Sequence, residues 1–347
     1  MYIKKILWAI ALIGLVIFGY FAFYIYNAMF SPNTNFEEEE TYIYISNDDT
    51  YQNVRTQLIP ILDDIDSFDA LATQKKYTSN VKSGKFKIKK GMNNNEIINS
   101  IRSKNIPVKL SFNNQASLEA LAGRIASQID ADSTNLLEAM TDEKFLKSSG
   151  FKKETALGMY LPNSYQIFWN TSANKFVERM KSEYDKFWTP NRVAKAKALN
   201  FTKDEVMALA SIVYEESKQK SEQPRVAGVY INRLKIGMPL QADPTIKFAA
   251  YQLPKYKNTI IKRVLNVHKD IESPYNTYKY RGLPPGLITM PDLSAIDAVL
   301  NYEKHDYLYF AADPKKPGFH RFAKSLSQHN NNARAYHQYL DQQGIRR

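Results

Sequence analysis

The hydrophobic residues between Thr202 and Ser217 recur at the spacing of an α-helix with one apolar face. Positions i, i+3, i+4 and i+7 of this stripe are occupied by Val206, Leu209, Ala210 and Val213. Thr202 and Glu205 form a capping-box pattern, in which each side chain binds a free backbone N–H at the start of the helix. The pattern therefore predicts a helix whose apolar stripe faces a core.

Two adjacent glutamates near the end of this helix are expected to have different surroundings. On the helical wheel Glu215 lies roughly 170° from the centre of the stripe, whereas Glu216 lies roughly 70° from it. Glu215 should be solvated, and partial desolvation should raise the pKa of Glu216 towards the range of a general acid. The helix alone favours a simpler alternative for Glu216, a boundary glutamate with a packed stem and a hydrated carboxylate.

A segment without charges runs from Ile6 to Tyr26 near the amino terminus. At about 1.5 Å per residue it is long enough to cross the hydrocarbon core of a membrane. No convincing small-residue cleavage site follows it, so we expect a retained transmembrane helix rather than a cleaved signal peptide. Lys4 and Lys5 before the segment and Glu37–Glu40 after it predict a single-pass protein of the inner (cytoplasmic) membrane. The amino terminus would be cytoplasmic and the rest of the chain periplasmic.

Strand and helix patterns alternate after this segment and predict an α+β fold. Residues 41–46 and 82–90 have the alternation of strands, and the second strand carries lysines on one face, which either contact a polymer or guard an edge against aggregation. Longer helical patterns predominate afterwards. The predicted organisation is an amino terminus at 1–5, a transmembrane helix at 6–29, a linker at 30–40, a small α+β subdomain at 41–112 and a mixed α+β domain at 113–347.

The charge and composition of the chain restrict its partners. Its 47 Lys and Arg against 35 Asp and Glu give a formal charge of +12, which favours an anionic partner, although such a charge also serves solubility. The expected anchor removes nucleic acid and leaves lipid head groups or the carboxylate-bearing cell-wall polymer. The chain has no cysteine, which excludes a disulfide scaffold, a lipid anchor through cysteine and a cysteine nucleophile.

Motifs of several common catalytic sites are absent from the sequence. There is no G-x-S-x-G, P-loop, G-x-G-x-x-G or H-E-x-x-H motif. The five histidines lack the spacing of a helical metal pair, so neither a metal nor a cofactor is expected. Carboxylate chemistry remains, and for a basic protein outside the membrane it points to glycosidic bonds.

Several polar clusters follow Glu216 in a fixed order. They are Tyr230–Leu234, Leu240–Thr245, Ser273–Tyr278, Gly282–Gly286 and Gln328–Asn330. Together with the A-S-I-V-x-x-E-S segment, they resemble the motifs of the YceG-like endolytic murein transglycosylases in order and spacing. The resemblance is sharpest from Glu205 to Asn330, while the apolar segment and residues 41–112 resemble that family's membrane segment and LysM-like subdomain more loosely.

The resemblance implies that Glu216 is the catalytic residue of a YceG-like catalytic domain. The family's glutamate two positions earlier is Tyr214 here, and its following threonine is Ser217. Acidic residues of the family are replaced by Leu157 and Asn163, which puts a substrate contact through Asn163 in doubt. Candidate substrate-binding residues are Asn232, Gln241, Asp243, Tyr275, Asn276, Tyr278, His329 and Asn330. Each of these also has a structural interpretation as a packing, capping or hydrogen-bonding residue.

The implied reaction is non-hydrolytic cleavage of the MurNAc–GlcNAc bond in nascent peptidoglycan strands. Glu216 would protonate the leaving oxygen and then, as a base, activate the muramyl 6-hydroxyl to close a 1,6-anhydro ring. The resemblance also implies a peptidoglycan synthase as a partner. The alternatives are a muramidase-type hydrolase with Asp243 or Glu222 as a second carboxylate, and a non-catalytic scaffold that binds the cell wall.

Overall fold

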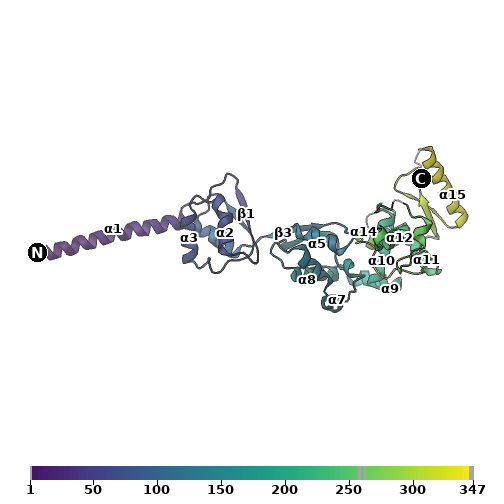
Figure 1. Ribbon diagram of the computed structural model, residues 1–347, viewed down its shortest axis with the longest axis horizontal. Coiled ribbons are helices and arrows are strands. Elements are labelled where there is room, and N and C mark those ends of the chain that lie inside the picture. The colour runs from purple at the N-terminus through teal and green to yellow at the C-terminus, as the bar shows by residue number, and fades with distance from the viewer. Residues whose placement is uncertain (1, 257–258, 262, 344–347) are drawn as a thin grey trace. The chain divides into compact units, whose positions relative to one another are not determined.

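The computed structural model describes residues 2–256, 259–261 and 263–343 (Figure 1). Two of the expected segments lie partly outside these ranges. They are the amino terminus, through residue 1, and the large domain, through residues 257–258, 262 and 344–347. The chain divides into two compact units. Unit 1 comprises Met1–Leu110, Ala126–Ala131 and Tyr165–Ser172, and unit 2 comprises Ser111–Ile125, Asp132–Ser164 and Ala173–Arg347. Both contain helices and strands, which confirms the mixed α+β class.

Unit 1 begins with helix α1, Tyr2–Phe30, which is long and apolar enough to cross a membrane. None of its residues is buried by the rest of the protein. This agrees with the expected apolar helix, because side chains that face lipid need no protein partner. An apolar helix near an amino terminus can serve as an anchor or as a signal sequence.

A two-stranded antiparallel sheet covers the core of unit 1. Its strands are β1, Glu40–Ile45, and β2, Gly84–Lys89, with Ile43 opposite Phe86 in the register. The apolar residues of both strands face the helices, and Tyr42, Tyr44 and the lysines lie on the other face. The helices are α2 (Tyr51–Leu58), α3 (Ile65–Gln74) and α4 (Asn94–Ser103).

The end of α1 is tied to unit 1 by a buried polar cluster. The Asn94 side-chain amide donates to the Ala28 carbonyl at 2.8 Å and to the Ser67 hydroxyl at 3.0 Å. Asn33 donates to the Asn94 side-chain oxygen at 2.6 Å. Because each of these buried polar groups has a partner, the cluster fixes where the chain leaves α1 and enters the folded unit.

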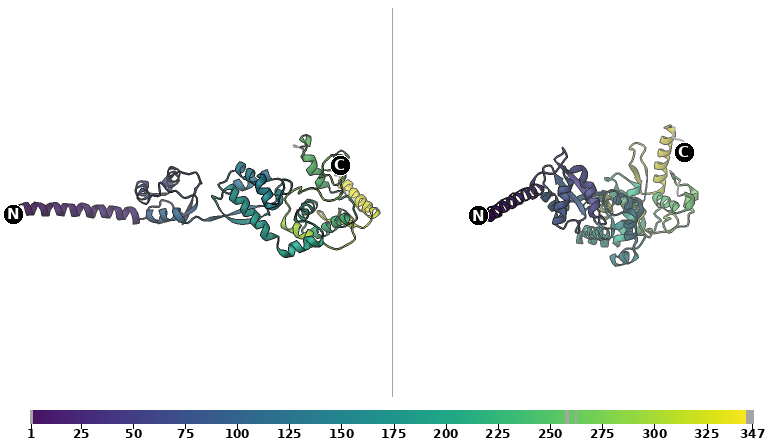
Figure 2. Two further views of the ribbon diagram at one scale, coloured as in Figure 1. Left: turned by 90° about the horizontal axis from the view of Figure 1, so that it is seen from below. Right: turned by 60° about the vertical axis from the view of Figure 1, so that its left-hand side comes forward.

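Unit 2 is built around helix α10, Lys203–Glu216, which packs against α11 (Gln223–Lys235), α12 (Asp243–Tyr251) and α14 (Leu293–Leu300) (Figures 1 and 2). Every residue of α10 from Val206 to Val213 is buried. The wheel predicted a single buried stripe, but neighbours on several sides bury the whole middle of the helix. The small residues Ala208, Ala210 and Ser211 permit this close packing.

The remaining elements of the chain complete the two units. The other helices are α5 (Leu118–Ala126), α6 (Ser133–Thr141), α7 (Glu143–Ser149), α8 (Ala173–Phe187), α9 (Pro190–Ala198), α13 (Asn266–Lys269) and α15 (Leu326–Gln342). Short 3₁₀ helices span Ile59–Ile61, Ala156–Met159 and Pro254–Tyr256. Strands β3 (Pro107–Phe112) and β4 (Asn163–Phe168) pair, as do β5 (Tyr309–Ala312) and β6 (His320–Ala323).

A glycine of α11 allows a loop to approach this helix closely. A Cβ atom on Gly228 would lie 2.5 Å from the Glu303 carbonyl oxygen and 2.6 Å from the His305 ring. No side chain fits there without a shift of the backbone. The loop that contains Glu303 and His305 leads into strand β5, so Gly228 fixes the distance between α11 and the hairpin of β5 and β6.

We expect Gly228→Ala to lower the free energy of unfolding by about 1–3 kcal/mol, since the methyl group must displace backbone. Gly123→Ala in α5 is the matched control. A Cβ atom at Gly123 meets nothing within 4 Å, and the change should be neutral or stabilise by about 0.5–1 kcal/mol. Thermal denaturation of both variants measures the difference, and equal stability of the two would contradict the close approach.

Candidate active site

The amino-terminal end of α10 has the capping box that the sequence predicts. The Glu205 backbone N–H donates to the Thr202 hydroxyl at 3.2 Å, and the Thr202 backbone N–H donates to the Glu205 carboxylate at 2.7 Å. At the other end the chain turns extended at Ser217, so Glu216 is the last helical residue. The burial of the middle of α10 and its fixed ends together place the Glu216 carboxyl where the helix meets the next loop.

Tyr230 of α11 holds the carboxyl group of Glu216. Its hydroxyl donates to Glu216 Oε1 at 2.7 Å, and its ring is almost completely buried. Burial raises the pKa of Glu216 to about 7, and the negative charge of Asp243 adds to this rise. The Tyr230 hydrogen bond and the positive charges of His320 and Arg233 oppose the rise. Near neutral pH the group is therefore divided between its acid and its carboxylate form.

Arg233 supplies a buried positive charge near Glu216. Its guanidinium donates to the Leu308 carbonyl through Nε at 2.6 Å and to the Leu240 carbonyl through Nη1 at 2.6 Å. Among the described residues it makes no ion pair with a carboxylate, and burial lowers its pKa. Its charge is thus not neutralised by a salt bridge, and it favours the ionised form of Glu216.

Glu222 connects the loop after Glu216 to strand β6. Its carboxylate accepts hydrogen bonds from the Ser217 hydroxyl at 3.2 Å, the His320 backbone N–H at 2.8 Å and His320 Nδ1 at 2.7 Å. Burial opposes ionisation of Glu222, but the His320 hydrogen bonds outweigh it and hold the pKa of Glu222 below its ordinary value. Glu222 is therefore a buried anion whose two oxygens both have partners.

Asp243 and Tyr278 are the predicted residues that lie beside Glu216. The Tyr278 hydroxyl donates to Asp243 Oδ1 at 2.6 Å, and Asp243 is exposed at the start of α12. Burial and this bond raise the pKa of Tyr278. The negative charge of Asp243 acts on Glu216 and raises the pKa of its carboxyl group, after the larger effect of burial. The structure thus brings together a partly buried acid, an exposed carboxylate and two tyrosine hydroxyls.

Two predicted asparagines use their side chains for internal hydrogen bonds. The amide of Asn232 donates to the backbone carbonyls of His305 at 2.7 Å and Tyr307 at 3.1 Å. Asn276 is fully buried, and its amide donates to the carbonyls of Lys269 and Ile271. These contacts match the structural interpretation of each residue, since Asn232 joins α11 to a loop and Asn276 orders the loop that carries Tyr278.

The other predicted residues lie around these elements in different settings. Gln241 is exposed with a backbone φ of 48°, and its backbone N–H donates to the Thr277 carbonyl at 3.0 Å. The Tyr275 ring packs against Phe248 with their centroids 4.6 Å apart. The His329 ring stacks on Tyr309 at 5.3 Å, and burial followed by the charge of Arg233 lowers the pKa of His329. Asn330 is exposed on α15.

Tyr230 and Arg233 belong to the Tyr230–Leu234 cluster, but neither they nor His320 are among the candidate site residues that the sequence predicts. Tyr230 and Arg233 stand three positions apart in a helix and share a face, whereas Asn232 is roughly 200° away from Tyr230. A helical wheel of α11 would therefore have shown that Tyr230 and Asn232 cannot point the same way. No comparable signal marks His320, because it reaches the site through the pairing of β5 with β6.

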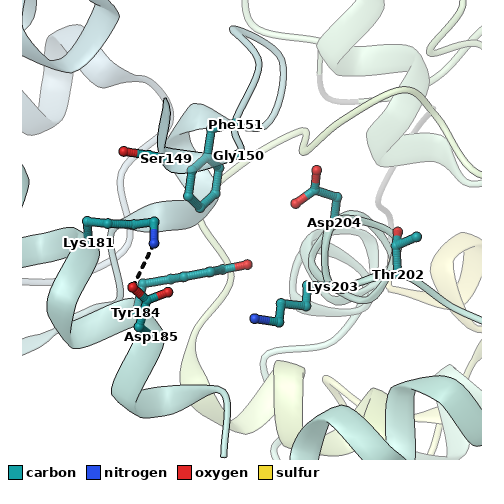
Figure 3. Close-up of a pocket in the computed structure, with 9 residues that line it drawn as sticks. All are labelled: Ser149, Gly150, Phe151, Lys181, Tyr184, Asp185, Thr202, Lys203 and Asp204. Carbon is teal, nitrogen blue, oxygen red and sulfur yellow. Dashed lines mark hydrogen bonds and ion pairs between the residues drawn. The ribbon is translucent and has the colours of Figure 1, made fainter. Parts of the chain in front are cut away.

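A separate pocket of about 350 Å³ lies at the opposite end of α10 (Figure 3). Lys181 and Tyr184 of α8 stand on one side of it, and Lys203 and Asp204 of α10 stand on the other. Burial raises the pKa of Asp204. The length of α10 separates this pocket from Glu216 by about 20 Å, so Asp204 is not a second carboxylate for chemistry at Glu216.

Residues 43–335 match the sequence model of the YceG-like family. The chain belongs to this family. A curated relative from Bacillus subtilis (strain 168), named endolytic murein transglycosylase, is 31% identical over 285 residues, which are 74% of this chain and 73% of the relative. A relative of the same name from Streptococcus pneumoniae serotype 2 is 27% identical over 293 residues, and the match covers 52% of its length. The resemblance inferred from the motifs is thus confirmed.

A solved structure supports the same assignment. A YceG-like protein of Listeria monocytogenes superimposes with a TM-score of 0.56 at 26% sequence identity, and the match covers 85% of this chain and 99% of that one. The YceG-like fold therefore extends through most of the chain.

Tyr230→Phe should raise the pKa of Glu216 above 7 by roughly one unit, because the lost hydrogen bond stabilises the carboxylate. The pKa of this carboxyl group can be measured by infrared spectroscopy across a pH series. The spectrum of Glu216→Gln is subtracted to isolate the signal of Glu216. Tyr275→Phe is the control, since the Tyr275 ring packs against Phe248 instead. An unchanged titration in Tyr230→Phe would contradict the role of this hydrogen bond.

Glu216→Gln should stabilise the protein above neutral pH. Because the folded state raises the pKa of Glu216 from 4.5 to about 7, it retains a proton that the unfolded chain loses in this range. The wild-type protein therefore loses stability as the pH rises from 4.5 to 7, by an amount on the order of 3 kcal/mol. The variant lacks this loss. Calorimetry at pH 5 and pH 8 should show a gain for the variant only at the higher pH.

Proposed function

We propose that this YceG-like protein is a membrane-anchored peptidoglycan lytic transglycosylase with Glu216 as its catalytic residue. The observation that carries the proposal is the setting of Glu216, which stands at the position of the family's catalytic residue. The Tyr230 hydroxyl donates to one of its carboxyl oxygens, and burial raises its pKa to about 7. The names of the curated relatives supply the substrate class, peptidoglycan.

The first step uses the protonated form of Glu216. Tyr230 donates to Oε1, so the acidic proton resides on the other oxygen. From there it would be donated to the glycosidic oxygen between MurNAc and GlcNAc. As this C–O bond breaks, the proton moves to the leaving GlcNAc hydroxyl and the muramyl ring gains oxocarbenium character. A pKa near 7 keeps a large share of Glu216 protonated at neutral pH, where an ordinary glutamate would be ionised.

The second step uses the resulting carboxylate. Ionised Glu216 removes the proton of the muramyl 6-hydroxyl, whose oxygen attacks the anomeric carbon and closes the 1,6-anhydro ring. No water is consumed, and Glu216 is protonated again for the next cycle. Tyr230, Arg233 and His320 stabilise the carboxylate between the two steps, because each lowers the pKa of Glu216.

The environment of the other carboxylates favours this route over hydrolysis. A hydrolase needs a second carboxylate as a base or nucleophile at a defined distance from the acid. Both oxygens of Glu222 are engaged by Ser217 and His320, which leaves this residue unsuited to that task. Asp243 is exposed and its charge acts on Glu216, so a muramidase that uses Asp243 is the second candidate function.

Helix α1 and unit 1 are consistent with cleavage of nascent peptidoglycan strands at the membrane. We assign α1 as a transmembrane anchor with its amino terminus in the cytoplasm, on the charge asymmetry of Lys4 and Lys5 against Glu37–Glu40. Unit 1 would act as a LysM-like module that contacts the wall, with Tyr42 and Tyr44 beside lysines on the open face of its sheet. A peptidoglycan synthase would be the source of the strands.

Glu216→Gln should lower the rate of release of anhydro-ended fragments by about 10²–10⁴-fold, since it removes the proton donor. Purified glycan strands are the substrate, and mass spectrometry of the products is the measurement. Glu215→Gln is the matched control, because Glu215 is exposed and paired with Lys218 at 3.0 Å.

Three other outcomes would contradict the proposal. Undiminished release of fragments by Glu216→Gln would exclude Glu216 as the acid. Products that carry one additional water would identify a hydrolase, and their loss in Asp243→Asn would identify its second carboxylate. Binding of strands by the wild type without products of either mass would leave only the wall-binding scaffold.

A further inference from the structure

We propose that a polar groove of unit 2 beside the Glu216 loop binds the peptide stem that branches from the muramyl residue of the glycan. The groove has a volume of about 800 Å³. Its polar lining comes from Asn113, Asn114, Arg124, Asn163, Lys220 and Asp292. This inference rests on the proposed function, because it concerns which part of the same polymer is recognised next to the site of cleavage.

The lining has the chemistry of a site for an acidic peptide. Arg124 and Lys220 offer positive charges to carboxylates, and Asp292 leaves the charged side chains of the lining with a net positive charge. The amide N–H groups of Asn113 and Asn163 donate no hydrogen bond to any described residue, so they remain available to peptide carbonyls. Stem peptides present both kinds of acceptor, carbonyl groups of amide bonds and free carboxylates.

The same lining is poorly suited to the glycan backbone itself. Its one aromatic side chain among the described residues is Phe112, which is only 4% exposed. The groove therefore has no open ring on which a sugar face could pack. We thus infer that the sugars lie at Glu216 and that the peptide branch enters this groove.

The groove adjoins the loop that begins at Glu216. Lys220 lies in this loop, four residues after the catalytic glutamate. The charges of Glu215 and Asp292 both raise the pKa of Tyr214, after the larger effect of its burial, which places Asp292 beside the last turn of α10. Lys220 and Asp292 thus place the groove at the same end of α10 as Glu216, on the side of Tyr214, and the branch would pass the end of the helix to reach it.

Hydrogen bonds also connect the two places. The Ser294 hydroxyl has one proton and can donate it to Asp292, at 3.0 Å, or to the Gln223 side-chain oxygen, at 2.8 Å, or share it between them. The Gln223 amide in turn donates to the Ser217 carbonyl at 3.1 Å. Ser217 directly follows Glu216, so the wall of the groove and the end of α10 are held in one rigid network.

Lys220→Glu tests the groove without a change in the catalytic machinery. The full chain in detergent is assayed on strands that carry complete stems and on strands from which an amidase has removed the stems. We expect the variant to lose roughly ten-fold in kcat/KM on the first substrate, mainly through KM, and nothing on the second. Lys144→Glu, which reverses an exposed charge on α7, should match the wild type on both substrates.

A binding experiment separates failure of the groove from failure of the proposed function. The probes are a synthetic stem pentapeptide with a free carboxyl terminus and its carboxyl-terminal amide, added to the Glu216→Gln protein. The free acid should bind several-fold more tightly than the amide, and Lys220→Glu should abolish the difference.

Each remaining outcome has a defined meaning. The inference would be overturned if Lys220→Glu lowered kcat/KM equally on strands with and without stems. It would also be overturned if the wild-type groove bound the two peptides equally tightly, even if anhydro products form. Selective binding of the acid without anhydro products from the wild type would retain the peptide groove and overturn the proposed function.

Discussion

The burial of helix α10 is the constraint on which the site depends. Helices on several sides enclose its middle from Val206 to Val213, so its last residue cannot shift without disturbing the core of unit 2. This rigidity holds the carboxyl of Glu216 in a partly dehydrated position, and dehydration is the main cause of its raised pKa. A loop would not hold a carboxyl group there, because it could turn the charge towards water.

Contacts around the site also hold the Glu216 region in place. Glu222 ties the loop after Glu216 to His320 of β6, and Gly228 lets the chain before β5 lie directly on α11. The short hairpin of β5 and β6 is thereby fixed against α11 and the loop that precedes it. Residues more than a hundred positions apart thus form one site, although most of its elements are short.

Local features of the site could be predicted from the sequence, and contacts between distant segments could not. The capping box of Thr202 and the different settings of Glu215 and Glu216 follow from helical geometry, which needs only neighbouring residues. The contact of Tyr230 with Glu216 depends on the turn between α10 and α11, and that of His320 depends on strand pairing. The same limit explains why Asn232 was grouped with the cleft, since its partners lie some seventy residues later.

The hydrogen bond from Tyr230 has a different strength in the two halves of the proposed reaction. A hydroxyl donates about twice as strongly to an ionised carboxylate as to a neutral acid. The bond is therefore weak while Glu216 holds its proton, and it strengthens as the proton leaves. A rigidly placed tyrosine thus favours the charged intermediate over the resting acid. The Tyr230 hydrogen bond makes proton release more favourable and reprotonation less favourable by the same free energy.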